Sequence, residues 1–305
     1  MSTTSASVTS ARVKTRFLII SDTHSASPSD NGANNDVSFR PLLPKADVLL
    51  HCGDLTMIGH LHEYETTLNM LESIDAGLKL VIAGNHDITL DEEYYVRKGP
   101  HMHRSGYDRD LPAKARNMWT GERAKRAGVT YLDEGTHQFT LQNGANLRVY
   151  ASPYQPEFCD FAFPYFRNQD RFNPPHQCTP YTVPIADNPV PDFPKIDVMM
   201  THGPPMGVLD ETDRGWGAQR VHWNDSDELD VKIEEHIKAA EAMHVDHEMA
   251  KEGRAATVDI SQGSSTAVEF GKQTLMVNAS IMTVRYKPWN APWLIDLDLD
   301  LEAAK

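Results

Sequence analysis

The sequence contains few cysteines, and their placement argues against a disulfide framework. Three occur in 305 residues, at Cys52, Cys159 and Cys178. Their number is odd and their spacing is wide, which is not typical of disulfide-bonded proteins or of cysteine-ligated metal sites. A reduced, intracellular compartment fits this set best, and we expect a cytoplasmic protein.

Long apolar runs are also missing. No run approaches the ~20 residues that a membrane-spanning helix needs, so we expect no membrane partner. Residues 1–15 are rich in Ser and Thr, carry no acidic residue and lack the apolar segment of a secretory signal. We interpret residues 1–15 as a disordered N-terminal tail and residues 16–300 as a single domain.

Positive charge is scarce as well. The chain has 29 Lys and Arg against 43 Asp and Glu, which gives a formal net charge of −14. Binding to a phosphate backbone needs a basic cluster that displaces counterions, so bulk nucleic acid is not expected as a partner. A small phosphorylated substrate, such as a nucleotide, can still bind at a local metal centre, because divalent ions supply a large positive charge.

What the sequence does have is four short islands of metal-ligand residue types, each directly after an apolar run. The islands are Asp22-Thr23-His24, Gly53-Asp54, Gly84-Asn85-His86-Asp87 and Thr201-His202-Gly203. Carboxylate, amide and imidazole groups are oxygen and nitrogen ligands of divalent metals. Strands packed side by side deliver their ends to one edge of a sheet, where open α/β sheets bind ligands. The sequence therefore predicts a metal-dependent active site at such an edge.

Strand and helix patterns around the islands predict an α/β fold. Apolar segments of strand length occur at 16–21, 48–52, 80–83, 129–132, 137–141 and 147–151. A helix is expected after the second island, on the apolar spacing of Leu61, Leu68, Leu71 and Ile74. Another helix is expected to end near Gly128. Alternating strands and helices followed by short strands favour mixed sheets covered by helices.

Two later stretches are interpreted as insertions. Prolines are dense at 165–195, which indicates a long structured loop, because strands are expected on both sides. Residues 225–253 are strongly acidic. Helical spacing in this stretch predicts one amphipathic surface helix, on the positions Leu229, Ile233, Ile237 and Ala240.

The islands also carry a resemblance to a known family. Their order, Asp-x-His, Gly-Asp, Gly-Asn-His-Asp and then His-Gly, resembles the calcineurin-like metallophosphoesterase superfamily. The segments similar to its small metallophosphoesterase-domain-containing branch are 53–56, 152–154, 201–205, 277–280 and 292–297. The resemblance covers residues 16–300 and implies one metallophosphoesterase domain. The implied fold is an α/β, four-layer α-β-β-α sandwich around a two-metal centre.

By this resemblance five residues are metal ligands. Asp54 is similar to the carboxylate that bridges two ions. Asp22 and His24 look like ligands of the first ion, and Asn85 and His202 look like ligands of the second. Oxygen and nitrogen ligands suit Mn, Fe or Zn. The implied activity is hydrolysis of a phosphodiester or phosphomonoester by attack of a water that bridges the two ions.

The resemblance gives His86 and Asp87 the catalytic roles. In the family, the histidine that matches His86 protonates the leaving alkoxide, a task that suits a group with a pKa near neutrality. Asp87 is expected to hold the His86 imidazole in orientation and to favour its protonated form.

One departure from the family pattern concerns the late metal ligands. The family normally continues after His-Gly with a Gly-His-x-His motif, which supplies one histidine to each metal. Here residues 214–221 resemble the segment that follows that motif. A helix, a strand and both histidines therefore look missing between about Asp213 and Trp216. The strand near Met199 and Met200 is expected to be left as an unpaired edge.

Two other histidine-rich stretches do not replace the missing motif. At 59–62, His60 and His62 are expected to point to different sides of a helix. Residues 244–248 lie in the acidic insertion, which favours a solvated face.

Two hypotheses remain. The intact islands favour a working phosphoesterase, and the missing histidines favour a catalytically impaired metal- or nucleotide-binding relative.

Overall fold

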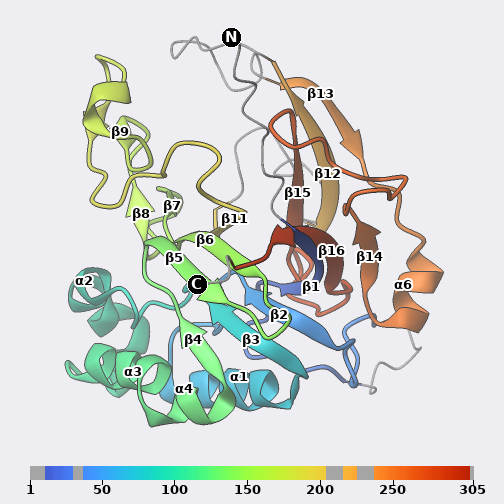
Figure 1. Ribbon diagram of the computed structural model, residues 1–305. Coiled ribbons are helices and arrows are strands. Elements are labelled where there is room, and N and C mark those ends of the chain that lie inside the picture. The colour runs from blue at the N-terminus through green and yellow to red at the C-terminus, as the bar shows by residue number, and fades with distance from the viewer. Residues whose placement is uncertain (1–10, 30–36, 204–215, 225–236, 303–305) are drawn as a thin grey trace.

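A computed structural model describes residues 11–29, 37–203, 216–224 and 237–302 and shows a mixed α/β fold with several sheets (Figure 1). The largest sheet has the order β14-β16-β1-β2-β3-β4. Its strands are β1 (Arg12–Ile20), β2 (Ala46–His51), β3 (Ala76–Val81), β4 (Val129–Tyr131), β14 (Ala256–Asp259) and β16 (Trp293–Asp300). β1 to β4 run parallel, and β16 pairs antiparallel with β1. The first three islands therefore follow adjacent parallel strands.

The first strand begins earlier than the sequence suggested. β1 starts at Arg12, and Val13 pairs with Leu299 of β16. Residues 12–15 therefore belong to the sheet and not to the expected tail, because the C-terminal strand offers them a complete ladder partner. Residues 1–10 lie outside the described part of the chain.

Smaller sheets complete the β structure. β5 (Gly135–Thr140), β6 (Asn146–Ser152) and β11 (Val198–Thr201) form a sheet of order β11-β6-β5. β12 (Trp216–Trp223), β13 (Ile237–Ala242) and β15 (Gln273–Ala279) form another, of order β13-β12-β15. Two-residue strands pair as β7 (Gln155–Pro156) with β8 (Pro164–Tyr165), and β9 (Gln169–Asp170) with β10 (Val183–Pro184).

The helices lie mainly beside the largest sheet. They are α1 (Leu61–Ser73), α2 (Glu92–His103), α3 (Leu111–Thr120), α4 (Glu122–Ala127) and α6 (His247–Gly253), with 3-10 turns at Arg104–Gly106 and Pro175–Gln177. In Figure 1, α1, α3 and α4 line one side of β2, β3 and β4. None of the helices that the structure describes is long and apolar enough to cross a membrane.

Two hydrophobic cores use opposite faces of the largest sheet. Phe17 and Leu50 pack in one core with Val149 of the second sheet. Leu18 and Leu49, one position away, pack in the other core with residues of α1 such as Leu68. Successive strand residues point to opposite faces, so these strands are apolar on both sides. This double burial fixes where each strand ends and therefore where its island lies.

Most of the predicted elements are confirmed. The expected strands at 16–21, 48–52, 80–83, 129–132, 137–141 and 147–151 correspond to β1 to β6 within a few residues. The expected helix after the second island is α1, with Leu68 and Leu71 fully buried. The helix expected to end near Gly128 is α4, which that glycine ends in a left-handed conformation.

The prediction for the acidic stretch is wrong in part. Ile237–Ala242 forms strand β13, where Ala240 pairs with Val221 of β12, and only His247–Gly253 is helical. Pairing with β12 outweighed the helical spacing, because a ladder partner decides the conformation of a short apolar segment. Leu229 and Ile233 lie outside the described residues. The proline-dense stretch contains β8, β9, β10 and a 3-10 turn within loops, as a structured loop would.

Candidate metal centre

The islands meet where β1, β2 and β3 end, and backbone hydrogen bonds tie them together. The Asp22 N–H donates to the carbonyl of Gly53 at 2.9 Å, and the His24 N–H donates to the carbonyl of Asp54 at 2.9 Å. Asp22, His24 and Asp54 all have positive φ, of 51°, 45° and 52°. Non-glycine residues rarely adopt this region, and strained backbone of this kind concentrates at functional sites.

Two glycines allow the close approach of these loops. A Cβ on Gly84 would lie 2.2 Å from the backbone nitrogen of Asp54 and 2.4 Å from its Oδ1. A Cβ on Gly53 would lie 2.5 Å from Nδ1 of His202. Both contacts are far inside van der Waals distance, so only glycine permits this packing.

The fourth island arrives from a different sheet. His202 follows β11, which belongs to the sheet β11-β6-β5 and not to the sheet of β1, β2 and β3. The expectation that all four islands lie on one sheet edge is therefore wrong. His202 still reaches the same site, because Met200 of β11 packs in the same hydrophobic core as Leu50 of β2.

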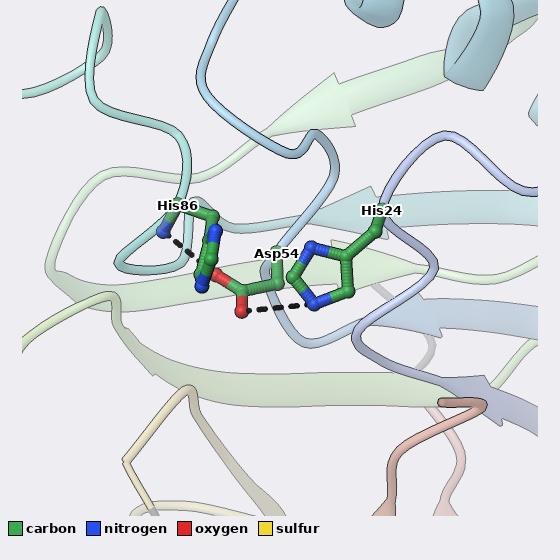
Figure 2. A group of neighbouring side chains, drawn as sticks. All are labelled: His24, Asp54 and His86. Atoms are coloured by element: carbon green, nitrogen blue, oxygen red, sulfur yellow. Dashed lines mark hydrogen bonds and ion pairs between the residues drawn. The ribbon is translucent and has the colours of Figure 1, made fainter. Parts of the chain in front are cut away.

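Asp54 lies between two histidines, one on each carboxylate oxygen. Its Oδ2 is 3.4 Å from Nε2 of His24, and its Oδ1 is 3.4 Å from Nε2 of His202. Figure 2 shows the Asp54 carboxylate directed toward the His24 ring. Only 3% of Asp54 is exposed to solvent. A carboxylate placed in this way presents one oxygen to each of two neighbouring positions.

Contacts with backbone carbonyl groups indicate the tautomers of His24 and His202. Nδ1 of His24 lies 2.9 Å from the carbonyl of Thr56, and Nδ1 of His202 lies 3.0 Å from the carbonyl of Cys52. A carbonyl oxygen only accepts hydrogen bonds, so each Nδ1 carries the proton and each Nε2 presents a lone pair. Holding the far nitrogen of an imidazole on a carbonyl is the usual support of a metal-ligand histidine.

Several acceptor atoms consequently face one another. Nε2 of His202 is 2.8 Å from Oδ1 of Asn85 and 3.4 Å from the Asp54 carboxylate. The donor atoms of His24, Asp54 and His86 also lie within 4.8 Å of one another. Lone pairs that converge at these distances repel unless a cation or a proton lies among them. The residues present therefore fit a bound metal ion.

Burial and neighbouring charged groups shift the pKa values of His24, Asp54 and His202. Burial raises the pKa of Asp54 to about 7, with His202 acting in the opposite direction. Burial and the neighbouring His86 lower the pKa of His24 to about 4. Burial alone lowers the pKa of His202, but Asp54 and Asp22 outweigh it and the net shift is upward. Ligand atoms must be deprotonated to bind a metal, so metal binding by Asp54 and His202 would depend on pH.

His86 lies at the open side of the site. Its backbone N–H donates to Oδ1 of Asp54 at 2.9 Å (Figure 2), and its ring lies edge to face with the His24 ring at 4.7 Å between centroids. Nδ1 of His86 is 2.7 Å from the carbonyl of Met57. The same logic puts a proton on this Nδ1 in the neutral ring, so Nε2 is the atom available to a substrate or a metal.

The expected partnership of Asp87 with His86 is wrong. Asp87 is fully buried, and its carboxylate accepts from the backbone of Gly84, Leu55 and Thr56 at 2.8–3.0 Å and from the Thr56 hydroxyl at 2.7 Å. Within the described residues no hydrogen bond joins Asp87 to the His86 ring. The Met57 carbonyl orients His86 instead. Asp87 holds the second and third islands together, because the N–H groups of two tight loops converge on it.

The histidine-rich stretch at 59–62 lies apart from this group. His60 and His62 do not point to different sides: their rings stack at 5.3 Å, and His60 also stacks on His103 at 4.1 Å. His60 precedes the first turn of α1 and is therefore outside the helical geometry that separates i and i+2. His247, in the other stretch, packs on Trp216 at 5.8 Å.

Some residues at the site were not expected from the sequence. Met57 supplies the carbonyl for His86, and its own N–H is fixed by Glu63 of α1 at 3.2 Å. Phe161 and Tyr286 place their rings 5.0 Å and 6.1 Å from the His86 ring. These residues lie outside the islands, so no local motif could reveal them. The segment in which the late histidines look missing, 204–215, lies outside the described residues.

The structure thus defines a class of site, a carboxylate and imidazole centre at the strand ends of an α/β sheet. Residues 15–237 match the family described as calcineurin-like phosphoesterase. The chain is 28% identical over 285 residues to metallophosphoesterase domain-containing protein 1 of Homo sapiens and, equally, to that of Mus musculus. These matches cover 93% of this chain and 71% of each relative. The protein belongs to the calcineurin-like phosphoesterase family.

Proposed function

We propose that this protein is a metal-dependent hydrolase that cleaves a phosphodiester or phosphomonoester of a small phosphorylated substrate. The observation that carries the proposal is the position of Asp54, whose two carboxylate oxygens each face the Nε2 of a different histidine at 3.4 Å. A carboxylate shared between two imidazoles suits two adjacent divalent ions. The family match supports the same activity.

The ligands divide around Asp54 into two sets. Asp22 and His24 would hold one ion, and Asn85 and His202 would hold the other. In the fold, Asn85 and His202 are already in contact at 2.8 Å, and the peptide groups of Asp22 and His24 are fastened to the Asp54 loop. Bound divalent ions such as Mn, Fe or Zn supply an activated water nucleophile and positive charge for the phosphoryl oxygens.

The remaining chemistry belongs to His86. When protonated, its Nε2 can give a proton to the leaving oxygen, and its Nδ1 stays on the Met57 carbonyl throughout. Asp54 anchors the His86 backbone, so the acid and the metal ligands keep a fixed relation. Reacting groups held in this way do not need to be ordered during the reaction.

The wider arrangement also belongs to the proposal. The two cores place α1 and the β5-β6-β11 sheet on opposite faces of the largest sheet, which supports the four-layer α-β-β-α sandwich that the family resemblance implies. A net charge of −14 supports a small substrate, such as a nucleotide, rather than a nucleic-acid polymer.

A second candidate function is a metal- or nucleotide-binding relative with little catalysis. It is favoured by the sequence between Gly203 and Trp216, which contains no histidine. In that case each ion has fewer protein ligands and more of its coordination is left to water.

The test combines metal content with hydrolysis of a chromogenic phosphodiester and a phosphomonoester. Protein stripped with a chelator and reloaded with Mn or Zn is expected to regain hydrolysis in proportion to the bound metal. Metal binding without turnover of either ester would favour the second candidate. Hydrolysis that persists after complete metal removal would contradict both.

A further inference from the structure

The loop between β15 and β16 reaches the metal centre from the far end of the chain. Its first residues are fixed beside the first island: the Ser21 N–H donates to the carbonyl of Ala279 at 3.0 Å, and the Ile281 N–H donates to the carbonyl of Ser21 at 2.9 Å. The Asn290 side chain donates to the carbonyl of Ser280 at 2.9 Å and closes the loop. The loop is therefore anchored next to the candidate ligand Asp22.

This loop presents Tyr286 to His86. The Tyr286 hydroxyl lies 3.5 Å from Nε2 of His86, and its ring lies 5.1 Å from the ring of His24. A contact of 3.5 Å is long for a hydrogen bond, but catalytic hydrogen bonds are often long before substrate binds. Nδ1 of His86 carries the proton toward Met57, so the Tyr286 hydroxyl is the donor and Nε2 is the acceptor in the neutral ring.

The backbone of Tyr286 has an unfavourable conformation. Tyr286 has a φ of 53°, in a turn closed by its own N–H on the carbonyl of Thr283 at 2.8 Å. About half of the residue, 51%, is exposed, so core burial does not explain the conformation. A bulky residue at positive φ that is not held by a core points to a function for its side chain.

A second aromatic ring restricts His86 independently. Phe161, from the segment between β7 and β8, packs on the His86 ring with centroids 5.0 Å apart and planes tilted by 32°. The edge of the ring is thus held by Met57 and Tyr286, and its surface is packed by Phe161. Rotation of the imidazole about its side-chain bonds would break these contacts.

We propose that Tyr286 is a positioning residue that holds Nε2 of His86 in the direction of the leaving-group oxygen. The inference rests on the proposed function, because it assigns His86 the proton transfer to that oxygen. In the neutral ring the hydroxyl donates to Nε2, while Nδ1 stays on the Met57 carbonyl, so the two contacts fix the rotation of the imidazole. Phe161 keeps the ring plane in place.

The first test compares Tyr286→Phe with wild type on esters of good and poor leaving groups. On an alkyl phosphodiester, whose leaving group needs the acid, kcat is expected to fall about 2–10-fold with little change in KM, since one hydrogen bond is lost. On a 4-nitrophenyl ester the loss is expected to be small. Tyr181→Phe, at an exposed tyrosine of the proline-dense stretch, is the matched control and is expected to match wild type. Equal losses on both esters, or none, would overturn the proposal.

The second test does not depend on activity. Long-range proton–nitrogen NMR of the metal-free protein reports the tautomer of His86, with the resonance assigned by loss in His86→Gln. We expect the Nδ1-protonated tautomer, and in Tyr286→Phe we expect the Nε2 resonance to move toward that of a nitrogen without a donor. An Nε2 resonance that stays in place refutes the positioning role. Absence of hydrolysis by metal-loaded wild type would instead refute the proposed function, and the NMR result would still decide the role of Tyr286.

Discussion

Asp54 is the residue on which the account depends most. It is buried, its pKa is raised by that burial, and both of its oxygens face imidazole nitrogens. An ionised carboxylate in such surroundings is costly unless a cation compensates it. The residue is thus poorly suited to a purely structural role and well suited to sharing metal ions.

His86→Ala separates metal binding from catalysis at the residue scale. The variant is expected to retain metal, because the five proposed ligands remain and His86 is the one member of the His24, Asp54 and His86 group outside that set. Turnover is expected to fall ~10²–10⁴-fold on substrates with poor leaving groups, and less on those whose leaving group departs as a stable anion. Steady-state rates on an alkyl and a 4-nitrophenyl ester, with metal content measured in parallel, check this. Loss of metal together with activity would make His86 a ligand rather than an acid.

His51 gives a pH dependence of stability. It is fully buried, Nε2 contacts the Thr23 hydroxyl at 2.8 Å, and burial lowers its pKa to about 3. Its ordinary value is 6.5, so below pH 6.5 the unfolded chain takes up a proton that the folded chain refuses, and stability is lost as pH falls from about 6.5 to 3. The loss from this group reaches a few kcal/mol at the acid end.

His51→Gln removes this titration. Relative to wild type, the metal-free variant is therefore expected to gain stability as the pH falls from 7 toward 4, as measured by denaturant unfolding. His176→Gln, at an exposed histidine, is the control for general effects of losing an imidazole. A constant difference between His51→Gln and wild type across this range would contradict the burial of a neutral His51.

The positions of the first three islands could be predicted from the sequence, because each follows a short apolar run that becomes a buried strand. The orientation of His86 could not. By sequence, the adjacent Asp87 was the obvious partner of the His86 ring. Its carboxylate instead accepts hydrogen bonds from the backbone N–H groups of Gly84, Leu55 and Thr56. A carbonyl such as that of Met57 leaves no trace in a motif, because every residue has one.

At the scale of elements, β1 to β3 and their loops form the base of the site. Their ends could be predicted because both faces of these strands are apolar. The origin of His202 on a second sheet and the strand β13 could not, since both depend on pairing with segments distant in sequence. Among the described residues β11 is at the edge of its sheet, and Met199 is exposed.

Asp87→Asn tests the connection between these loops. Asparagine turns one acceptor into a donor that faces backbone N–H groups, so the fold is expected to lose about 1–3 kcal/mol of unfolding free energy. Metal affinity is expected to fall with it, because Gly84 and Leu55 flank the proposed ligands Asn85 and Asp54. Denaturant unfolding and metal titration measure both effects, with the exposed Asp75→Asn as control. Unchanged stability with reduced turnover would restore Asp87 as the partner of His86.

At the scale of the whole molecule, the family match spans residues 15–237 and the similarity to the mammalian relatives covers 93% of the chain. The net charge of −14 supports the proposal of a small substrate. No Gly-His-x-His sequence follows His202, although the family resemblance implied two late histidines there. Asp54 therefore has the central role in the proposed metal binding.

The most direct test is metal binding by wild type and Asp54→Asn, measured by calorimetric titration with Mn or Zn and by metal content after dialysis. Wild type is expected to bind divalent ions, and Asp54→Asn is expected to lose binding at both positions, more severely than Asp22→Asn. The variant is expected to fold, because burial already favours the neutral form of Asp54. Two equivalents of metal retained by Asp54→Asn, or no divalent ion bound by wild type, would contradict the account.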